Sequence, residues 1–182
     1  MPVVSIEGNI GSGKSTLLDS LSSEFVVIKE RIDQWPLAEF YQDQARWAFP
    51  LQIRILQTMK KPTILDVVFH ERCPSTSNKV FWTHLMENHL SGIENIIYQD
   101  VYNKYHWDPD YHIYLKSTPE FCFENIKKRN QTGDDGVTME YLKELHELYE
   151  KHMMTIPGLV TIDAMRDPKL VHLDVINFIR NT

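Results

Sequence analysis

Short apolar runs alternate with stretches of helical periodicity along most of this chain. Because strands that alternate with helices favour a parallel sheet covered on both faces, the pattern predicts an α/β fold built on a central five-stranded parallel sheet. The strands are predicted at Val3–Glu7, Phe25–Lys29, Ile64–Phe69, Tyr111–Leu115 and Leu159–Ile162. The helices are predicted at Lys14–Ser22, Ala45–Lys60, Ser75–His89, Pro119–Lys128, Met139–His152 and Pro168–Arg180. One of these helices contains Pro50, so it either starts late or bends there.

Length and charge narrow the class of protein. The chain has 182 residues, which suits one domain over residues 1–182, and it contains no signal peptide or long apolar span. Its 19 basic and 25 acidic residues leave a formal net charge of −6, which argues against a nucleic-acid-coating or membrane-surface protein. Two cysteines far apart in the sequence, Cys73 and Cys122, suggest a reducing compartment. We expect a cytoplasmic protein whose partners include neither nucleic acid nor membrane.

A phosphate-binding loop occupies Gly8–Ser15, which reads Gly-Asn-Ile-Gly-Ser-Gly-Lys-Ser and satisfies the G-x-x-x-x-G-K-[ST] spacing. A predicted strand precedes it and a predicted helix follows it, which is the context that the motif requires. Backbone N–H groups of such a loop close around phosphates, and the helix N-terminus adds a positive dipole end. Lys14 would reach the terminal phosphates and the Ser15 hydroxyl would bind Mg²⁺. The sequence therefore predicts a nucleotide-binding protein.

Acidic–basic pairs follow two further predicted strands, Glu30-Arg31 after the second and Glu71-Arg72 after the third. Ligands bind at the carboxyl ends of the strands in open parallel sheets. A carboxylate there could accept a proton from a substrate hydroxyl, Arg72 could hold the transferring phosphoryl group, and Glu71 could hold Mg²⁺ through water. The alternative is that strand ends are simply exposed and charged. Two such pairs beside a phosphate-binding loop favour the functional interpretation.

A polar, glycine-containing segment spans Asn125–Gly136 between two predicted helices, with Lys127, Lys128 and Arg129 at its start. Such a segment could close over the phosphates as a short lid and exclude water. It could equally be a solvated basic helix end that interacts with the helix dipole. Spacing alone leaves both interpretations open.

Several motifs together resemble the deoxyribonucleoside kinases of the deoxycytidine, deoxyguanosine, mitochondrial thymidine and insect multisubstrate type, and the resemblance covers nearly the whole chain. They are Ile6-Glu-Gly-Asn-Ile-Gly-Ser-Gly-Lys-Ser-Thr16, Tyr41-x5-Trp47-Ala-Phe-Pro-Leu-Gln52, Glu71-Arg72-Cys73 where the family has Glu-Arg-Ser, Ile97-Tyr-Gln-Asp100, Tyr114-Leu-x-x-Thr-Pro-Glu120 and Glu140-Tyr-Leu-x-x-Leu-His146. The resemblance implies a P-loop kinase fold with a short lid. It also implies ATP and Mg²⁺ as cofactors, a deoxynucleoside substrate and a homodimer.

The resemblance implies a role for each matching residue. Glu30 resembles the general base, Arg72 the arginine that holds the 5′-oxygen and the incoming phosphoryl group, and Glu71 the acid near Mg²⁺, which Ser15 would also bind. Lys14 would complete the catalytic set. The substrate pocket would consist of Glu30, Trp35, Tyr41, Leu51, Gln52, Met59, Arg72, Ser77, Phe81 and Asp134. ATP would contact Gly8, Asn9, Gly11, Gly13, Lys14, Ser15 and Thr16 in the loop, and also Arg129 and Asp163.

Two departures from the family pattern bear on the lid and the base pocket. Of the lid arginines only Arg129 survives, because Asn125 and Gln131 occupy two other arginine positions. Deoxycytidine-selective relatives carry an arginine and an aspartate deep in the base pocket, where this chain has Met59 and Ser77. These smaller or neutral side chains leave room for the thymine methyl group. Room for one methyl group favours thymidine over deoxycytidine by only about 1–3 kcal/mol.

The predicted reaction is transfer of phosphate from ATP to the 5′-hydroxyl of a deoxyribonucleoside, with thymidine as the leading substrate and deoxycytidine also accepted. One alternative is a nucleoside monophosphate kinase of the thymidylate type, which would need further cations for the acceptor phosphate. The other is a P-loop switch protein that hydrolyses nucleotide to regulate a partner. Such a switch would need no acceptor pocket, whereas Tyr41, Gln52 and Phe81 indicate one.

Overall fold

A five-stranded parallel sheet forms the centre of the protein, with the strand order β2-β3-β1-β4-β5. The computed structural model describes residues 2–63, 66–129, 134 and 136–182. The strands are β1 (Val3–Glu7), β2 (Val26–Ile28), β3 (Val68–Glu71), β4 (Tyr111–Lys116) and β5 (Val160–Asp163). The predicted α/β class and five-stranded parallel sheet are confirmed.

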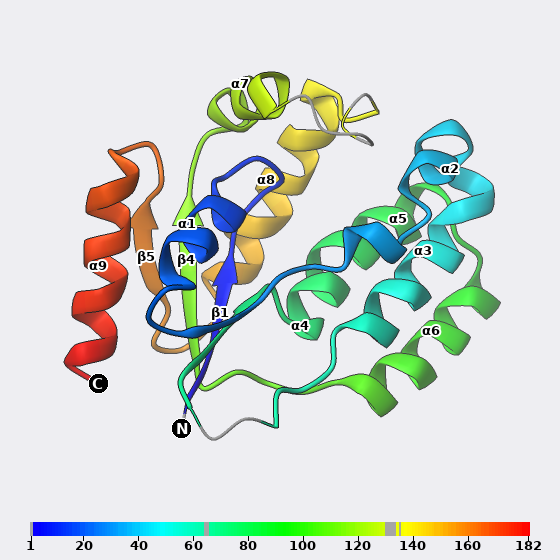
Figure 1. Ribbon diagram of the computed structural model, residues 1–182. Coiled ribbons are helices and arrows are strands. Elements are labelled where there is room, and N and C mark those ends of the chain that lie inside the picture. Colours follow the sequence, from blue (N-terminus) through cyan, green and yellow to red (C-terminus); the bar gives the residue numbers. More distant parts are fainter. Residues whose placement is uncertain (1, 64–65, 130–133, 135) are drawn as a thin grey trace.

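Helices flank the sheet, and α7 lies above the carboxyl ends of β1 and β4 (Figure 1). The longer helices are α1 (Lys14–Leu21), α3 (Gln44–Thr58), α6 (Gly92–Tyr105), α7 (Pro119–Arg129), α8 (Met139–Met153) and α9 (Pro168–Arg180). The shorter ones are the 3₁₀ turn η1 (Ile32–Gln34), α2 (Leu37–Gln42), α4 (Pro74–Thr76), the π-helical η2 (Ser77–Trp82) and α5 (Thr83–Asn88). Among the described residues, no helix combines the length and the apolar character needed to cross a membrane.

Side chains alternate between the two faces of the sheet, as the strand period of two requires. On β1, Val4 and Ile6 enter a large apolar cluster with residues of α1 and α9. Ser5 and Glu7, which alternate with them and point to the opposite face, are polar yet fully buried. On β4, Tyr114 faces away from that cluster and packs with residues of α8 and η2. One face of the sheet is therefore covered by α1 and α9, and the opposite face by α8 and η2.

Most predicted boundaries lie within two residues of those in the structure, but one strand and one helix differ more. The third strand was predicted at Ile64–Phe69 but lies at Val68–Glu71, and residues 64–65 lie outside the described part of the chain. The prediction relied on apolar side chains, so it missed the polar end at His70 and Glu71. Parallel strands pair through backbone groups, and Glu71 pairs in register with Ile6.

The helix predicted at Ser75–His89 is divided into α4, η2 and α5. The structure also adds α2 and α6, which the periodicity did not predict. A capping box marks the start of α6, where Ser91 Oγ accepts from the backbone N–H of Glu94 and the Glu94 carboxylate accepts from that of Ser91. The helix that contains Pro50 starts at Gln44, well before the proline.

Candidate active site

The loop between β1 and α1 is shaped by glycines in the left-handed region, with φ of 80° at Gly11 and 96° at Gly13. A Cβ added at Gly11 would lie 2.4 Å from the backbone oxygen of Cys122 in α7, so no larger residue fits there. Lys14 turns back over the loop, where its Nζ donates to the carbonyl oxygens of Gly8 at 3.1 Å and Asn9 at 2.9 Å. The loop is thus folded around its own lysine.

Lys14 is buried beside other charged groups. Burial, and secondly the positive charge of Arg72, lower the pKa of Lys14 to about 8. The amine is therefore mostly protonated at neutral pH but begins to lose its proton within about one pH unit above it. The negative charge of an incoming polyphosphate would favour the protonated form.

Oxygen ligands of the kind that Mg²⁺ prefers meet beside the loop. Ser15 Oγ donates to Glu71 Oε1 at 2.9 Å, and the Glu71 Oε2 accepts from the backbone N–H of Glu30 at 3.4 Å. A hydroxyl and a carboxylate next to a phosphate-binding loop fit a Mg²⁺ ion that also contacts phosphate oxygens. The two predicted metal residues lie in direct contact.

Arg72 connects three parts of the site. Its Nη1 forms an ion pair with Glu30 Oε1, its Nε donates to the Tyr149 hydroxyl at 2.8 Å, and its Nη2 donates to the carbonyl oxygen of Gly8 at 3.2 Å. Its guanidinium carbon lies 4.9 Å from the centroid of the Phe81 ring, within the range of a cation–π contact. The guanidinium group is therefore held in place by contacts from two loops and from the helices α8 and η2.

The backbone at Arg72 is strained. Its φ of 58° is left-handed, an arrangement that costs a non-glycine residue of order 1–3 kcal/mol. The Arg72 N–H donates to the Ile6 carbonyl at 3.0 Å, and the His70 Nδ1 lies 2.7 Å from the Arg72 carbonyl oxygen. These bonds keep the strained turn that aims the side chain into the site.

Burial raises the pKa of the Glu30 carboxyl group, and the positive charge of Arg72 only partly opposes that rise. A carboxylate whose pKa is raised binds a proton more readily, as a general base requires. Glu30 and Arg72 together form a proton acceptor beside a fixed cation.

A single cavity of about 1390 Å³ extends from the phosphate-binding loop to an apolar pocket. Every residue predicted to bind the substrate lines it, namely Glu30, Trp35, Tyr41, Leu51, Gln52, Met59, Arg72, Ser77, Phe81 and Asp134. Of the predicted nucleotide contacts, Gly11, Gly13, Lys14, Ser15, Thr16 and Arg129 line it, as does Glu71. The cavity thus brings together residues predicted for the nucleotide and residues predicted for the substrate.

The deep end of the cavity is apolar apart from one amide. Gln52 is 2% exposed, and the Ser77 hydroxyl donates to its Oε1 at 3.3 Å. Met59 caps the C-terminus of α3, lines the same cavity and is also buried. Trp35 is held against α3 by its Nε1, which donates to Thr58 Oγ1 at 3.0 Å. A buried amide with capacity to spare for hydrogen bonds suits a planar heterocycle.

Two described residues of the predicted lid segment, Arg129 and Asp134, form an ion pair. Arg129 donates to both carboxylate oxygens of Asp134, each at 2.7 Å. Burial, and secondly the nearby Asp134, raise the pKa of Tyr41 to about 12, so its hydroxyl keeps its proton. Asn125, which stands where the deoxyribonucleoside kinases have an arginine, donates to the Gly11 carbonyl at 2.9 Å and so supports the phosphate-binding loop. Gln131 lies outside the described residues.

Three predicted nucleotide contacts do not line the cavity, namely Gly8, Asn9 and Asp163. The Asn9 side chain faces α8, where Nδ2 donates to the Leu142 carbonyl at 2.9 Å. Asp163 accepts from the backbone N–H of Met165 at 2.9 Å, while its neighbours Ala164 and Arg166 reach the cavity.

Sequence reasoning missed Tyr149, whose hydroxyl accepts from Arg72. It lies on the buried face of α8 with Leu142, Leu145 and Met153. The sequence signal that could have identified it is a tyrosine among the aliphatic residues on the buried face of this helix. Phe40, Ile55 and Tyr141 are further cavity-lining residues that the sequence analysis did not name.

Comparisons with known proteins agree with this geometry. A family model described as deoxynucleoside kinase matches residues 4–180. A putative kinase protein of Invertebrate iridescent virus 3 is 34% identical over 93% of this chain and 91% of its own length. A probable deoxycytidine kinase of Fowlpox virus is 32% identical over 81% of this chain and 70% of its own. Human mitochondrial thymidine kinase 2 is 27% identical over 84% of this chain and 64% of its own.

Proposed function

The chain belongs to the deoxynucleoside kinase family, and on that basis we propose that it transfers the γ-phosphoryl group of ATP to the 5′-hydroxyl of pyrimidine deoxyribonucleosides, thymidine foremost. It is an enzyme of the deoxynucleoside kinase type, so ATP is the phosphate donor. The preference for thymidine, the use of Mg²⁺ and the residue roles below are proposals.

The continuous cavity is the observation that carries the proposal. Its one end is the phosphate-binding loop with Lys14, and its other end is the pocket around Gln52. Glu30 and Arg72 lie between the two ends in a buried ion pair. A P-loop switch protein has no use for the second half of this cavity.

Each residue of the junction has a chemical role in the proposed transfer. The 5′-oxygen attacks the γ-phosphorus, the bond to the ADP oxygen breaks, and the hydroxyl proton passes to the Glu30 carboxylate. Arg72 and Lys14 face the charge that develops on the phosphoryl oxygens. Ser15 and Glu71 would hold Mg²⁺, which neutralises phosphate charge when bound. Little covalent chemistry is needed, so positioning and charge stabilisation supply the rate.

The pocket around Gln52 supports pyrimidine recognition. Its amide has one donor side and one acceptor side, which pair with O4 and N3–H of thymine or, turned over, with N3 and N4–H of cytosine. The Ser77 hydroxyl contacts this amide and can rotate to donate or to accept, so it supports either orientation. Met59 is neutral and flexible, which accommodates the thymine 5-methyl group.

A panel of thymidine, deoxycytidine, deoxyadenosine, deoxyguanosine and thymidine monophosphate with Mg-ATP tests the proposal by relative kcat/KM. We expect thymidine first, deoxycytidine within about 200-fold because one methyl group discriminates by no more than that, and the purines below both. Preference for a purine deoxynucleoside would overturn the base assignment. Preference for the monophosphate would indicate a thymidylate-type kinase instead.

A homodimer is a second element of the proposal. Within the chain, α3 contacts η2 and α6. The outer face of α6 carries Ile93, Ile96 and Ile97, which are 62%, 59% and 44% exposed at helical spacing. Two such faces would bury each other by the hydrophobic effect. Light scattering of wild-type protein and of an Ile96→Glu variant measures this, and a monomeric wild type would contradict it.

A further inference from the structure

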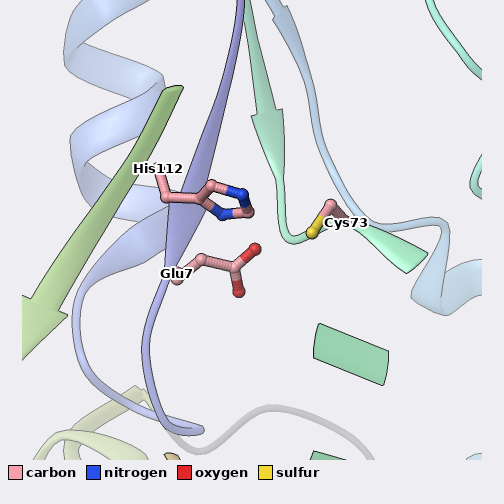
Figure 2. Close-up of side chains that lie close together, drawn as sticks. All are labelled: Glu7, Cys73 and His112. Carbon is pink, nitrogen blue, oxygen red and sulfur yellow. The ribbon is translucent and has the colours of Figure 1, made fainter. Parts of the chain in front are cut away.

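Three side chains with metal-binding atoms converge beneath the phosphate-binding loop. They are Glu7 at the end of β1, Cys73 just after β3 and His112 on β4 (Figure 2). One ligand atom from each lies within 4.8 Å of the other two. This cluster belongs to neither the nucleotide nor the nucleoside end of the cavity, because none of its members lines that cavity.

The cluster lies on the polar face of buried strands. Glu7 and Cys73 are fully buried and His112 is partly buried. On β1, Ser5 is in register with His70 on one side and His112 on the other. These polar residues occupy the positions between the apolar ones, so they project together into the space under α8. Without a ligand, an arrangement of this kind is costly, because buried polar atoms need partners.

Partners are missing at several of these atoms. Among the described residues, Glu7 Oε2 and His112 Nδ1 are buried and form no hydrogen bond, and neither do His70 Nε2 and His152 Nε2. Glu7 is one of the charges that act on all three histidines. A carboxylate, a thiol and an imidazole therefore lie together, and the Glu7 Oε2 and His112 Nδ1 atoms have no hydrogen-bond partner among the described residues.

We propose that Glu7 Oε2, Cys73 Sγ and His112 Nδ1 bind a divalent transition-metal ion of the Zn²⁺ type. A mixed sulfur, nitrogen and oxygen donor set selects Zn²⁺ over Mg²⁺, which demands oxygen. Water would fill the fourth position of a tetrahedral site. On binding, the Cys73 thiol releases its proton to solvent and the thiolate coordinates the metal.

Such an ion would link two strands that serve catalysis. Glu7 directly precedes Gly8 of the phosphate-binding loop, and Cys73 directly follows the strained Arg72. A bond from the metal to each would restrain the loop base and the arginine turn together. The ion is therefore structural and distinct from the Mg²⁺ that accompanies ATP.

Cobalt(II) is the probe that separates the two metals. In excess Mg²⁺, we expect wild-type protein to bind about one equivalent of Co²⁺ with a sulfur-to-metal charge-transfer absorption, and Zn²⁺ to displace it. The Mg²⁺ ligands Ser15 and Glu71 contain no sulfur, so Co²⁺ there gives no such band. Absence of the band in the wild type would overturn the proposal.

Two cysteine variants locate the site. Cys73→Ser should abolish the band and weaken Zn²⁺ binding by at least about 10–100-fold. A loss of that size follows even when a residue that only hydrogen-bonds to a metal ligand is replaced. Cys122→Ser is the matched control, because Cys122 is the other buried free cysteine and lies outside the cluster. The proposal fails if Cys73→Ser keeps the band or if Cys122→Ser loses it.

A thermal measurement covers the third ligand. Zn²⁺ should raise the Tm of wild-type protein, since a ligand that binds only the folded state stabilises it. Glu7→Gln keeps a group that can accept the Ser5 hydroxyl bond, so it should fold, yet its Tm should respond much less to Zn²⁺. An equal Tm response of Glu7→Gln and wild type would remove Glu7 from the ligand set.

Discussion

Replacing Glu30 by glutamine removes the proposed proton acceptor while keeping the shape of the side chain. Loss of a general base costs roughly 10²–10⁴ in turnover, which corresponds to about 3–5 kcal/mol of barrier. Removing one partner of a buried ion pair costs roughly 3–5 kcal/mol of stability. The glutamine oxygen still accepts from Arg72, which also keeps Tyr149 and Gly8 as partners, so the loss of stability should fall below that range.

The assay is steady-state release of ADP with saturating thymidine and Mg-ATP, together with a titration of ATP binding and a thermal melt. We expect Glu30→Gln to melt as a folded protein, to lose kcat by the amount above, and to change the KM for ATP by less than about threefold. Asp33→Asn makes the same chemical change at an exposed carboxylate that pairs with Arg31, and it should leave kcat unaltered. A kcat of Glu30→Gln within about tenfold of wild type would refute the role of Glu30.

Three further predictions concern the donor half of the site. The pKa of Lys14 in the free enzyme is about 8, so the KM for ATP should be lowest below pH 8 and rise above it by up to about tenfold per pH unit, because the deprotonated amine no longer attracts phosphate. Tyr149→Phe removes a hydrogen bond to Arg72 worth about 1.5 kcal/mol, so kcat/KM should fall about tenfold in initial-rate assays. Gly11→Ala places a Cβ against the Cys122 carbonyl, so ATP titration should show binding at least about tenfold weaker.

Each of these three has an internal control. A KM for ATP that stays flat from pH 7 to 9 contradicts the lowered pKa of Lys14. Tyr114→Phe removes a hydroxyl that bonds Glu150 beside the Tyr149 ring, and an equal loss of activity there would mean that the Tyr149 effect is mere packing. Gly92→Ala meets no atom within 4 Å and should leave ATP binding intact.

The local sequence was enough for the parts of the site that are local in space. The loop Gly8–Ser15 requires glycines and a lysine at fixed spacing within a strand–loop–helix, so the motif alone predicted nucleotide binding. Apolar periodicity predicted five parallel strands because each buried strand contains its own short run of apolar residues. It failed for β3, whose polar end at His70–Glu71 is held by backbone pairing, and for α6, whose isoleucines are exposed.

Tertiary structure decided what depends on contacts between distant segments. Nothing in the local sequence indicates that the Arg72 guanidinium bonds Tyr149, 77 positions along the chain, or that Asn9 faces α8 instead of the nucleotide. Glu7 and His112 appear as scattered polar residues in apolar runs until strand pairing and the turn at Cys73 bring the three residues of the cluster together. The pattern of a strand specifies which face is buried, but only the pairing of strands specifies which polar groups share that face.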